Sequence, residues 1–314
     1  MKAIICTRYG PPEVLQLKEV EKPTPKNDEI LVKVHATAVT ASDSLMRRSD
    51  LPVMFSLMRR LGVGLLKPRK AITGFVLAGE VEAVGKDVKL FKKGDQIYGS
   101  AGLRMGAYAE YACLPEAQTL TGCLAIKPAT LSYEEAAAVP YGAMIAMHFL
   151  NKGNVQRGQR VLVYGASGAI GTAAIQLAKF AGAEVTGVCS AANLALVKSL
   201  GADKVIDYTR DDSVNSLEQY DIVLDAVGKR KTSKLKVACQ HALAPGGKYL
   251  SVDRGAPRPR AQYLVQLKQL IEEGKFKAVI DRSYPLEQIA EAHRYVDQGH
   301  KKGNVVITVG VIRG

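Results

Sequence analysis

Two hydrophobic patterns divide the chain near residue 122. Before that point, short runs rich in β-branched residues end at Pro, Gly or Asn, a pattern typical of strands joined by tight turns. These runs are 2–9, 13–21, 29–39, 79–84 and 95–99. The basic, Met- and Leu-rich stretch 44–70 interrupts them and favours a short helix or a lid. The first part of the chain is therefore expected to be β-rich.

After residue 122, apolar runs of strand length alternate with amphipathic stretches of helical length. The expected strands are 160–165, 184–189, 204–208, 221–227 and 248–252, and the expected helices are 132–150, 170–181, 192–200 and 232–243. Apolar strands that alternate with helices indicate a buried parallel sheet with right-handed crossovers. From residue 261 the pattern predicts two further helices and a final strand.

Length, charge and cysteine usage narrow the class of protein. A chain of 314 residues with 47% hydrophobic residues fits two globular domains, and its net charge of +13 favours an anionic partner such as nucleic acid, acidic lipid or a phosphate-bearing ligand. The uncharged stretches 136–151 and 161–178 are broken by Pro140, His148 or glycines, so no membrane span is expected. No C-x-x-C spacing and no apolar signal segment are found, which predicts a reduced, cytoplasmic protein.

A glycine-rich turn between an expected strand and helix is the sharpest local feature. Gly165 permits the tight turn, Gly168 lets the backbone approach a pyrophosphate, and Gly171 lets helix and strand pack closely. The diphosphate of a dinucleotide would then face free N–H groups at the start of the helix. The expected phosphate-binding residues are Gly165, Ser167, Gly168, Ala169, Ile170 and Gly171.

The end of the next expected strand bears on which dinucleotide would bind. NAD sites place a carboxylate there, but in this chain no acid follows residues 188–190 before Asp203. Ser190, Asn193 and Tyr208 are placed to donate to a 2′-phosphate instead. The sequence thus favours NADPH, with NADH as the alternative cofactor. The competing interpretation is that these side chains are an ordinary helix cap and surface polar residues.

Segments along essentially the whole chain together resemble the medium-chain dehydrogenase/reductase superfamily, in its zinc-free quinone-oxidoreductase branch. They are 9–43, 79–99, 134–150, the glycine turn, 200–208, 220–228 and 284–309. The resemblance implies an α/β fold, with a Rossmann doubly wound parallel sheet and a GroES-like β-rich domain formed by both chain ends. The implied domains are 1–122 (GroES-like), 123–254 (Rossmann, NADPH-binding) and 255–314 (return to the catalytic domain).

The resemblance also implies the chemistry. Zinc-dependent members have Cys where this chain has Thr40 and His where it has Phe75, and neither replacement supplies a thiolate or imidazole ligand, so no metal is expected. The branch reduces a quinone, or the C=C bond of an α,β-unsaturated carbonyl, with hydride from NADPH. Thr40, Tyr141 and backbone N–H groups are the candidate donors to the resulting oxyanion, and Asp43 is a candidate to orient them.

This chain departs from many relatives beside the expected 2′-phosphate site. They carry Lys or Arg just after the position of Ser190, where this chain has Ala191 and Ala192. Without that cation the 2′-phosphate would be bound less tightly. Lys301 or Lys302 is a candidate to replace its charge.

Two other functions stay open at this point. One is a reductase of carrier-bound or CoA-bound enoyl groups; the other is a nucleotide-bound RNA-binding or regulatory protein of the same fold with little catalysis. An aromatic content of 6% offers few stacking platforms for bases, so nucleic acid is not the expected partner. The expected partner is a small quinone or enone, and the expected assembly a monomer or homodimer.

The positive charge is concentrated in two stretches. Residues 44–70 carry seven Lys or Arg against one Asp, and residues 229–260 carry nine against one Asp. We expect the second stretch to be a solvated face. For the first, we hypothesise that Arg47 and Arg48 attract the anionic cofactor or substrate.

Overall fold

The computed structural model describes residues 1–50, 64, 68–228, 233–254 and 257–310. The chain divides into two compact units, of which the first comprises 1–140, 259–269 and 280–314 and the second 141–258 and 270–279. The domain boundaries at residues 122 and 254 stay a prediction. Most of the stretch for which a helix or lid was expected lies outside the described residues.

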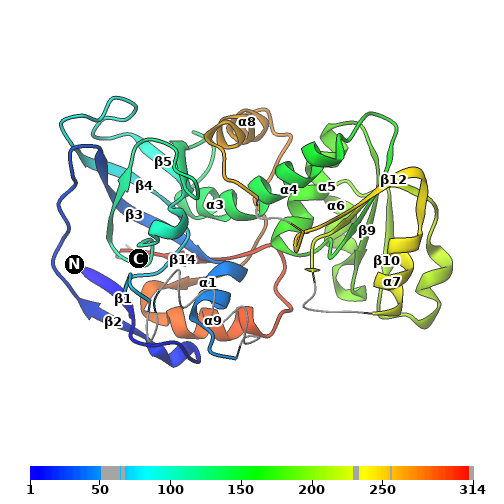
Figure 1. Cartoon of the computed structure of the whole chain (residues 1–314), viewed down its shortest axis with the longest axis horizontal. Helices are drawn as coiled ribbons and strands as arrows, with labels where there is room; N and C mark the ends of the chain where they lie inside the picture. The colour runs from blue at the N-terminus through cyan, green and yellow to red at the C-terminus, as the bar shows by residue number, and fades with distance from the viewer. Residues whose placement is uncertain (51–63, 65–67, 229–232, 255–256, 311–314) are drawn as a thin grey trace. The chain divides into compact units, whose positions relative to one another are not determined.

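A sheet built from both chain ends forms the first unit. Its strand order is β13-β14-β3-β4-β5-β7, with β6 also paired to β3 (Figure 1). The strands are β3 (Glu29–Val39), β4 (Val76–Val84), β5 (Gln96–Ser100), β6 (Tyr111–Pro115), β7 (Cys123–Ile126), β13 (Ile280–Pro285) and β14 (Asn304–Thr308). Antiparallel pairing of Val305 with Val39 joins the last strand to the early part of the chain. The GroES-like expectation for both chain ends is thereby confirmed.

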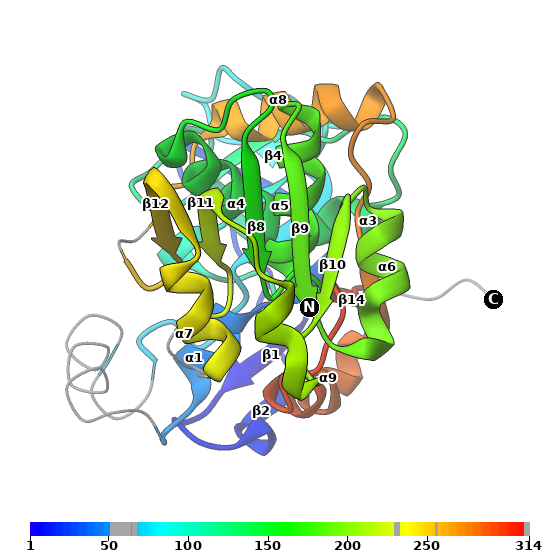
Figure 2. The same cartoon turned by 90° about the vertical axis from the view of Figure 1, so that its right-hand side faces the viewer.

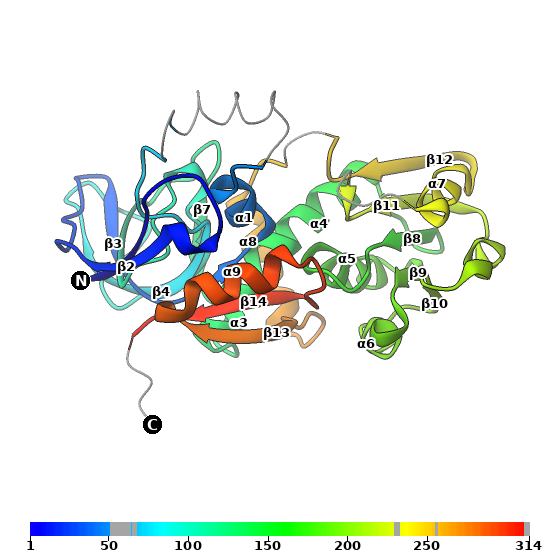
Figure 3. The ribbon, with the colours of Figure 1, turned by 90° about the horizontal axis from the view of Figure 1, so that it is seen from below.

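Smaller elements complete this unit. The strands β1 (Lys2–Cys6) and β2 (Leu15–Glu19) pair antiparallel, and the helices are α1 (Ala41–Arg47), α3 (Tyr133–Ala138), α9 (Ile289–Asp297) and most of α8 (Ala261–Glu272). Helix α9 packs against β13 and β14 (Figure 3) and also contacts α1. Fully buried side chains such as Ile30, Leu77 and Val305 form the core beneath it. The α1–α9 contact places two polar helices over that core.

The second unit contains a parallel sheet of order β10-β9-β8-β11-β12 (Figure 2). Its strands are β8 (Arg160–Tyr164), β9 (Glu184–Cys189), β10 (Lys204–Asp207), β11 (Tyr220–Asp225) and β12 (Leu243–Ser251), and its helices are α4 (Pro140–Gly153), α5 (Ala169–Phe180), α6 (Leu194–Ser199) and α7 (Lys234–His241). From β8, the chain adds β9 and then β10 on one side of the sheet. It then adds β11 and β12 on the other side of β8. This reversal is the topological switch of a doubly wound sheet, so the predicted fold class is confirmed.

The single helix expected over 132–150 is in fact two helices. Helix α3 begins after a capping box between Ser132 and Glu135, and α4 begins at Pro140. Proline has no N–H to donate to the preceding turn and its fixed φ suits the first position of a new helix, so the pattern breaks there. Strand β13 was also not predicted, because its polar sequence IDRSYP shows no apolar alternation.

Short 3₁₀ helices connect several of these elements. They are η1 (Pro12–Val14), η2 (Gly102–Arg104), η3 (Ala191–Asn193), η4 (Asp211–Ser216) and η6 (Leu286–Gln288). Within the described part of the chain, no helix combines the length and apolar character that crossing a membrane requires.

Candidate active site

The predicted glycine turn joins β8 to α5. Gly165 has φ +83°, a left-handed conformation that favours glycine, and a Cβ there would lie 2.4 Å from Val227 Cγ2. A Cβ on Gly171 would lie 2.2 Å from the carbonyl oxygen of Gly165. Packing within the protein therefore accounts for the glycines at both positions.

Gly168 is different, because the protein itself does not require a glycine there. Its backbone is extended, with φ −79° and ψ 176°, and a Cβ would meet nothing closer than Gly165 O at 3.6 Å. Gly168 is the N-cap of α5, and Thr172 N donates the helical bond back to its carbonyl oxygen at 2.9 Å. The N–H groups of residues 169–171 precede that bond and have no partner within the helix. Open space beside free N–H groups fits a phosphate ligand.

The residues predicted to bind the ribose end lie next to this turn. Asn193 donates from Nδ2 to Ser167 Oγ at 3.2 Å and to Ser190 Oγ at 3.1 Å, so one amide links the glycine turn to the end of β9. The Tyr208 backbone donates to Cys189 O at 3.0 Å, and its side chain is 41% exposed. The structure therefore brings Ser167, Ser190, Asn193 and Tyr208 together at one edge of the sheet.

Asp207 lies at the same edge and was missed by the sequence analysis. In the parallel register it is opposite Cys189, and its carboxylate accepts from Thr209 N at 2.9 Å and Thr209 Oγ1 at 2.7 Å. Desolvation opposes ionisation of Asp207, but hydrogen bonds from Thr209 and from the Ala191 backbone outweigh it and lower the pKa. Asp207 does not follow β9 along the chain but ends the neighbouring strand β10, and it reaches the same edge because parallel strands end there together.

A second missed feature is the turn that follows β11. The Asp225 carboxylate accepts from Val227 N at 3.1 Å and Gly228 N at 3.0 Å, and it pairs with Lys236 Nζ at 3.0 Å. Lys236 also donates to Gly228 O. Both side chains of this pair are nearly fully buried. Because Val227 packs on Gly165, this ion pair holds one side of the glycine turn.

The two predicted catalytic side chains belong to different units. Thr40 is the N-cap of α1, is 3% exposed, and donates from Oγ1 to Asp43 Oδ2 at 2.5 Å. Asp43 N donates to Thr40 Oγ1 at 3.2 Å and Thr40 N donates to Asp43 Oδ2 at 2.8 Å, and these two reciprocal bonds form a capping box. Tyr141 is the second residue of α4 and is half-buried. While Asp43 is ionised, the single hydroxyl hydrogen of Thr40 is committed to it.

Asp43 belongs to a buried polar cluster that no sequence motif predicted. Burial raises its pKa to about 6 although Thr40 and Tyr108 act to lower it, and its Oδ1 makes no hydrogen bond among the described residues. The Tyr108 hydroxyl is 3.3 Å from His293 Nε2. Burial lowers the pKa of His293 to about 3, and the Arg47 charge adds to this effect. His293 is thus a neutral buried ring.

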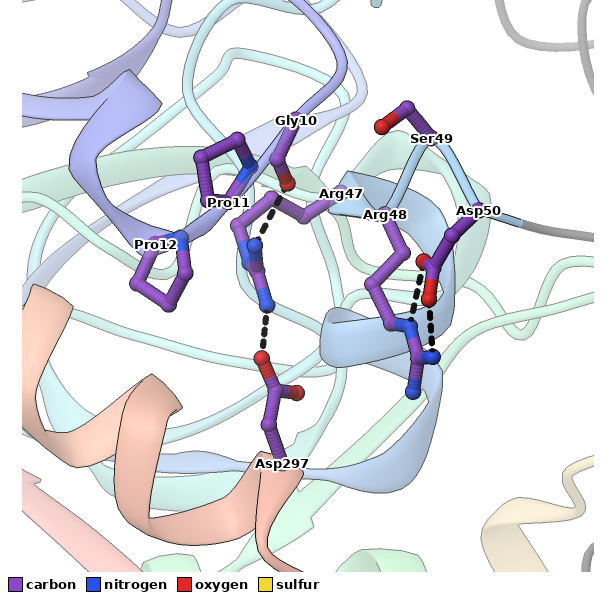
Figure 4. A pocket seen from close by; sticks show the side chains of 8 residues that line it. All are labelled: Gly10, Pro11, Pro12, Arg47, Arg48, Ser49, Asp50 and Asp297. Carbon is purple, nitrogen blue, oxygen red and sulfur yellow. Dashed lines mark hydrogen bonds and ion pairs between the residues drawn. The ribbon is translucent and has the colours of Figure 1, made fainter.

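A pocket of about 370 Å³ lies at the outer end of this cluster (Figure 4). Arg47 donates to Gly10 O at 2.5 Å and pairs with Asp297, while Arg48 Nε donates to Asp50 at 2.8 Å. The two guanidinium charges are therefore cancelled by two carboxylates, and Arg47 is only 2% exposed. The buried Arg47 is therefore unavailable to an anionic ligand, whereas for the exposed Arg48 the hypothesis stays a prediction.

The remaining predicted groups are the expected metal-ligand position and the candidate replacement cation Lys301. Across the residues that the structure describes, no group of three or more His, Cys, Asp or Glu is placed to hold a metal ion. Phe75, at the expected position of a ligand, is an apolar side chain 9% exposed. Lys301, a candidate replacement cation, donates to Gly303 O at 2.5 Å in its own turn.

Comparison with known proteins identifies the family. Residues 26–124 match the family described as alcohol dehydrogenase GroES-like domain, and residues 169–275 and 256–307 match two families that are both described as zinc-binding dehydrogenase. The chain belongs to the medium-chain dehydrogenase/reductase superfamily, as its sequence predicted.

Individual relatives cover almost the whole chain. It is 33% identical to a 2-methylene-furan-3-one reductase of Solanum lycopersicum, over 98% of this chain and 79% of the relative. It is 30% identical to an NADPH-dependent alkenal/one oxidoreductase of Arabidopsis thaliana, over the same fractions. Among solved structures, a quinone oxidoreductase from Coxiella burnetii superposes with a TM-score of 0.84 at 28% identity, over 99% of both chains.

Proposed function

We propose that this protein is an NAD(P)H-dependent oxidoreductase that transfers hydride, without zinc, to a quinone or to the C=C bond of an α,β-unsaturated carbonyl. The observation that carries the proposal is Gly168, whose open surroundings and helix-start N–H groups suit a diphosphate. The names of the tomato, Arabidopsis and Coxiella relatives support the cofactor and the substrate class.

The chain's own residues would hold the cofactor at the carboxyl edge of the parallel sheet. Backbone N–H groups at the start of α5 would bind the diphosphate, and Ser167, Ser190, Asn193 and Tyr208 would surround the ribose next to it. When bound, NAD(P)H supplies the hydride. The protein's contribution is to orient the two reactants and to stabilise the negative charge that develops on the substrate oxygen.

Zinc independence rests on the chemistry of the available donors. Thr40 caps a helix and bonds to Asp43, and Phe75 has no donor atom at all. A zinc alkoxide mechanism needs thiolate or imidazole ligands at such positions. We therefore propose that oxyanion stabilisation comes from hydrogen bonds.

Thr40 and Tyr141 stay our candidates for that stabilisation. Protonation of Asp43 would reverse the short bond, so that Asp43 donates to Thr40 Oγ1 and the threonine hydroxyl hydrogen becomes available. Thr40 would then be an effective donor chiefly at acidic pH, because burial raises the pKa of Asp43 to about 6. Above that range, we propose Tyr141 and backbone N–H groups as the donors.

The experiment adds a side chain at Gly168. The extended backbone accepts Val without strain, so Gly168→Val should fold and yet occupy the space meant for phosphate. We expect its dissociation constant for the reduced cofactor, measured by nicotinamide fluorescence, to rise at least about 100-fold, a loss of about 2.7 kcal/mol. Gly168→Ala should show an intermediate effect. Unchanged cofactor affinity in folded Gly168→Val would refute the proposed site.

A further inference from the structure

The cations of the described segment 179–210, which contributes to the expected ribose site, are all engaged by other groups. Between residues 179 and 210, every position of which the structure describes, the chain has four Lys or Arg residues. Lys179 pairs with Asp203, Lys198 donates to Asp203 O, Lys204 pairs with Glu184 and Glu218, and Arg210 pairs with Asp212. A 2′-phosphate bound here would meet no uncommitted cation from this segment.

The same region presents a carboxylate acceptor and only neutral donors. Asp207 is ionised and lies beside Ala191, the first residue after Ser190. Asn193 is 8% exposed and donates from Nδ2 to two serine hydroxyls, so it has no donor left for a phosphate. A ribose 2′-hydroxyl can donate to the Asp207 carboxylate, whereas a 2′-phosphate dianion has no hydrogen to give.

Electrostatic repulsion also disfavours a bound 2′-phosphate. A dianionic phosphate near the Asp207 carboxylate is repelled, and the exposed Ala191 and Ala192 offer no compensating charge. The neutral hydroxyls of Ser190 and Tyr208 can still donate to a phosphate, so NADPH is not rejected. Neutral donors bind a phosphate less strongly than Arg or Lys does.

We infer that this protein uses NADH about as well as NADPH, and that Asp207 together with the uncharged Ala191–Ala192 pair sets this relaxed selectivity. The inference rests on the proposed function and deepens it. It assigns a specificity-determining role to a carboxylate on β10 that acts on the ribose substituent, while the diphosphate would be held by α5.

The test compares the two cofactors on one acceptor. The ratio of kcat/KM for NADPH to kcat/KM for NADH should lie between about 0.1 and about ten, and each limit corresponds to about 1.4 kcal/mol. A stronger preference for either cofactor would overturn the inference while leaving the proposed reductase intact. Failure to bind or oxidise either cofactor would instead overturn the proposed function, so the two failures are distinguishable.

Variants then locate the determinant. Asp207→Asn should raise the NADPH-to-NADH ratio of kcat/KM about three- to tenfold, and Ala192→Arg should raise it at least as much. The matched control is Asp211→Asn, which removes the same charge from an exposed position four residues further along the chain. Equal shifts in Asp207→Asn and Asp211→Asn, or no shift in Asp207→Asn, would contradict the role assigned to Asp207.

Discussion

Arg47 donates from Nε to Nδ1 of His293 at 3.4 Å, across 246 residues of sequence and inside the protein. The guanidinium is always protonated, so Nδ1 of His293 must accept and the imidazole proton must reside on Nε2, facing Tyr108. Arg47 in turn pairs with Asp297. One arginine therefore links α1 to α9 and fixes the tautomer of a histidine that burial, with a smaller effect of the Arg47 charge, keeps neutral.

Replacement of Arg47 should destabilise the protein far more than replacement of its neighbour. Arg47→Met leaves Asp297 and the Gly10 carbonyl without their partner, and we expect a loss of about 2–4 kcal/mol in the free energy of unfolding. Arg48→Met breaks an exposed pair with Asp50 and should cost less than about 1 kcal/mol. Urea unfolding measures both, and equal losses would show that the buried pair is not the linkage described.

The pH dependence of stability should expose Asp43 and His293 as opposing groups. Asp43 has a raised pKa, so the native state holds its proton between about pH 4 and 6 and stability falls as pH rises through that window. His293 has a lowered pKa, so stability rises with pH from about 3 to its ordinary value near 6.5. The two slopes, each about 1.4 kcal/mol per pH unit, nearly cancel between pH 4 and 6.

Single variants separate the contributions of Asp43 and His293 to the pH dependence of stability. In Asp43→Asn only the histidine contribution remains, and the free energy of unfolding should rise with pH between 4 and 6 more steeply than in the wild type. His293→Gln should show the reverse, a fall over the same window. Chemical unfolding at several pH values gives the comparison. If both variants follow the wild-type curve, neither group carries the assigned proton linkage.

Lys236 should matter for cofactor binding although it is buried behind the turn. Lys236→Met leaves Asp225 without its cation and loosens the Val227 turn that packs on Gly165, so the dissociation constant for the reduced cofactor should rise about tenfold. The KM for the acceptor should change little. The control is Lys234→Met, which removes the same charge from an exposed position on α7. A similar loss of cofactor affinity in the control would argue against a role of Lys236 in positioning the glycine turn.

Gly171 and Gly168 should differ in what they tolerate. A Cβ on Gly171 would collide with the Gly165 carbonyl oxygen, so Gly171→Ala should lower the free energy of unfolding by about 1–3 kcal/mol. Gly168→Ala should lower it by less than about 1 kcal/mol and act on cofactor affinity instead. Thermal unfolding of the two proteins without ligand distinguishes these effects, and equal destabilisation would count against the distinction.

The parts of the site that sequence could predict are those formed by neighbours in the chain. The glycine turn and the start of α5 are a local strand–turn–helix, so residues 165–171 could be placed from spacing alone. Ser190, Asn193 and Tyr208, which the structure brings together, were named because strand and helix alternation indicated where β9 and β10 end, and their role in cofactor binding stays a prediction. The parallel sheet followed from the same alternation, whereas the Rossmann and GroES-like architecture was implied by the family resemblance.

What sequence could not reveal depends on which distant segments meet. Asp207 is relevant because β10 lies beside β9, and strand order is not written in the local pattern. Arg47 was misread as a free cation because Asp297 is 250 residues away. The Asp225–Lys236 pair was missed for a similar reason, since buried charges on a strand and a helix show no periodicity.

The most direct test of the central claim is the oxidation of the reduced cofactor, followed by its absorbance, when a quinone or an α,β-unsaturated ketone is added to the purified protein. The account predicts consumption with either NADPH or NADH that persists in the presence of a zinc chelator and is lost in Gly168→Val. Absence of turnover across a panel of both acceptor classes, together with absence of cofactor binding, would contradict it.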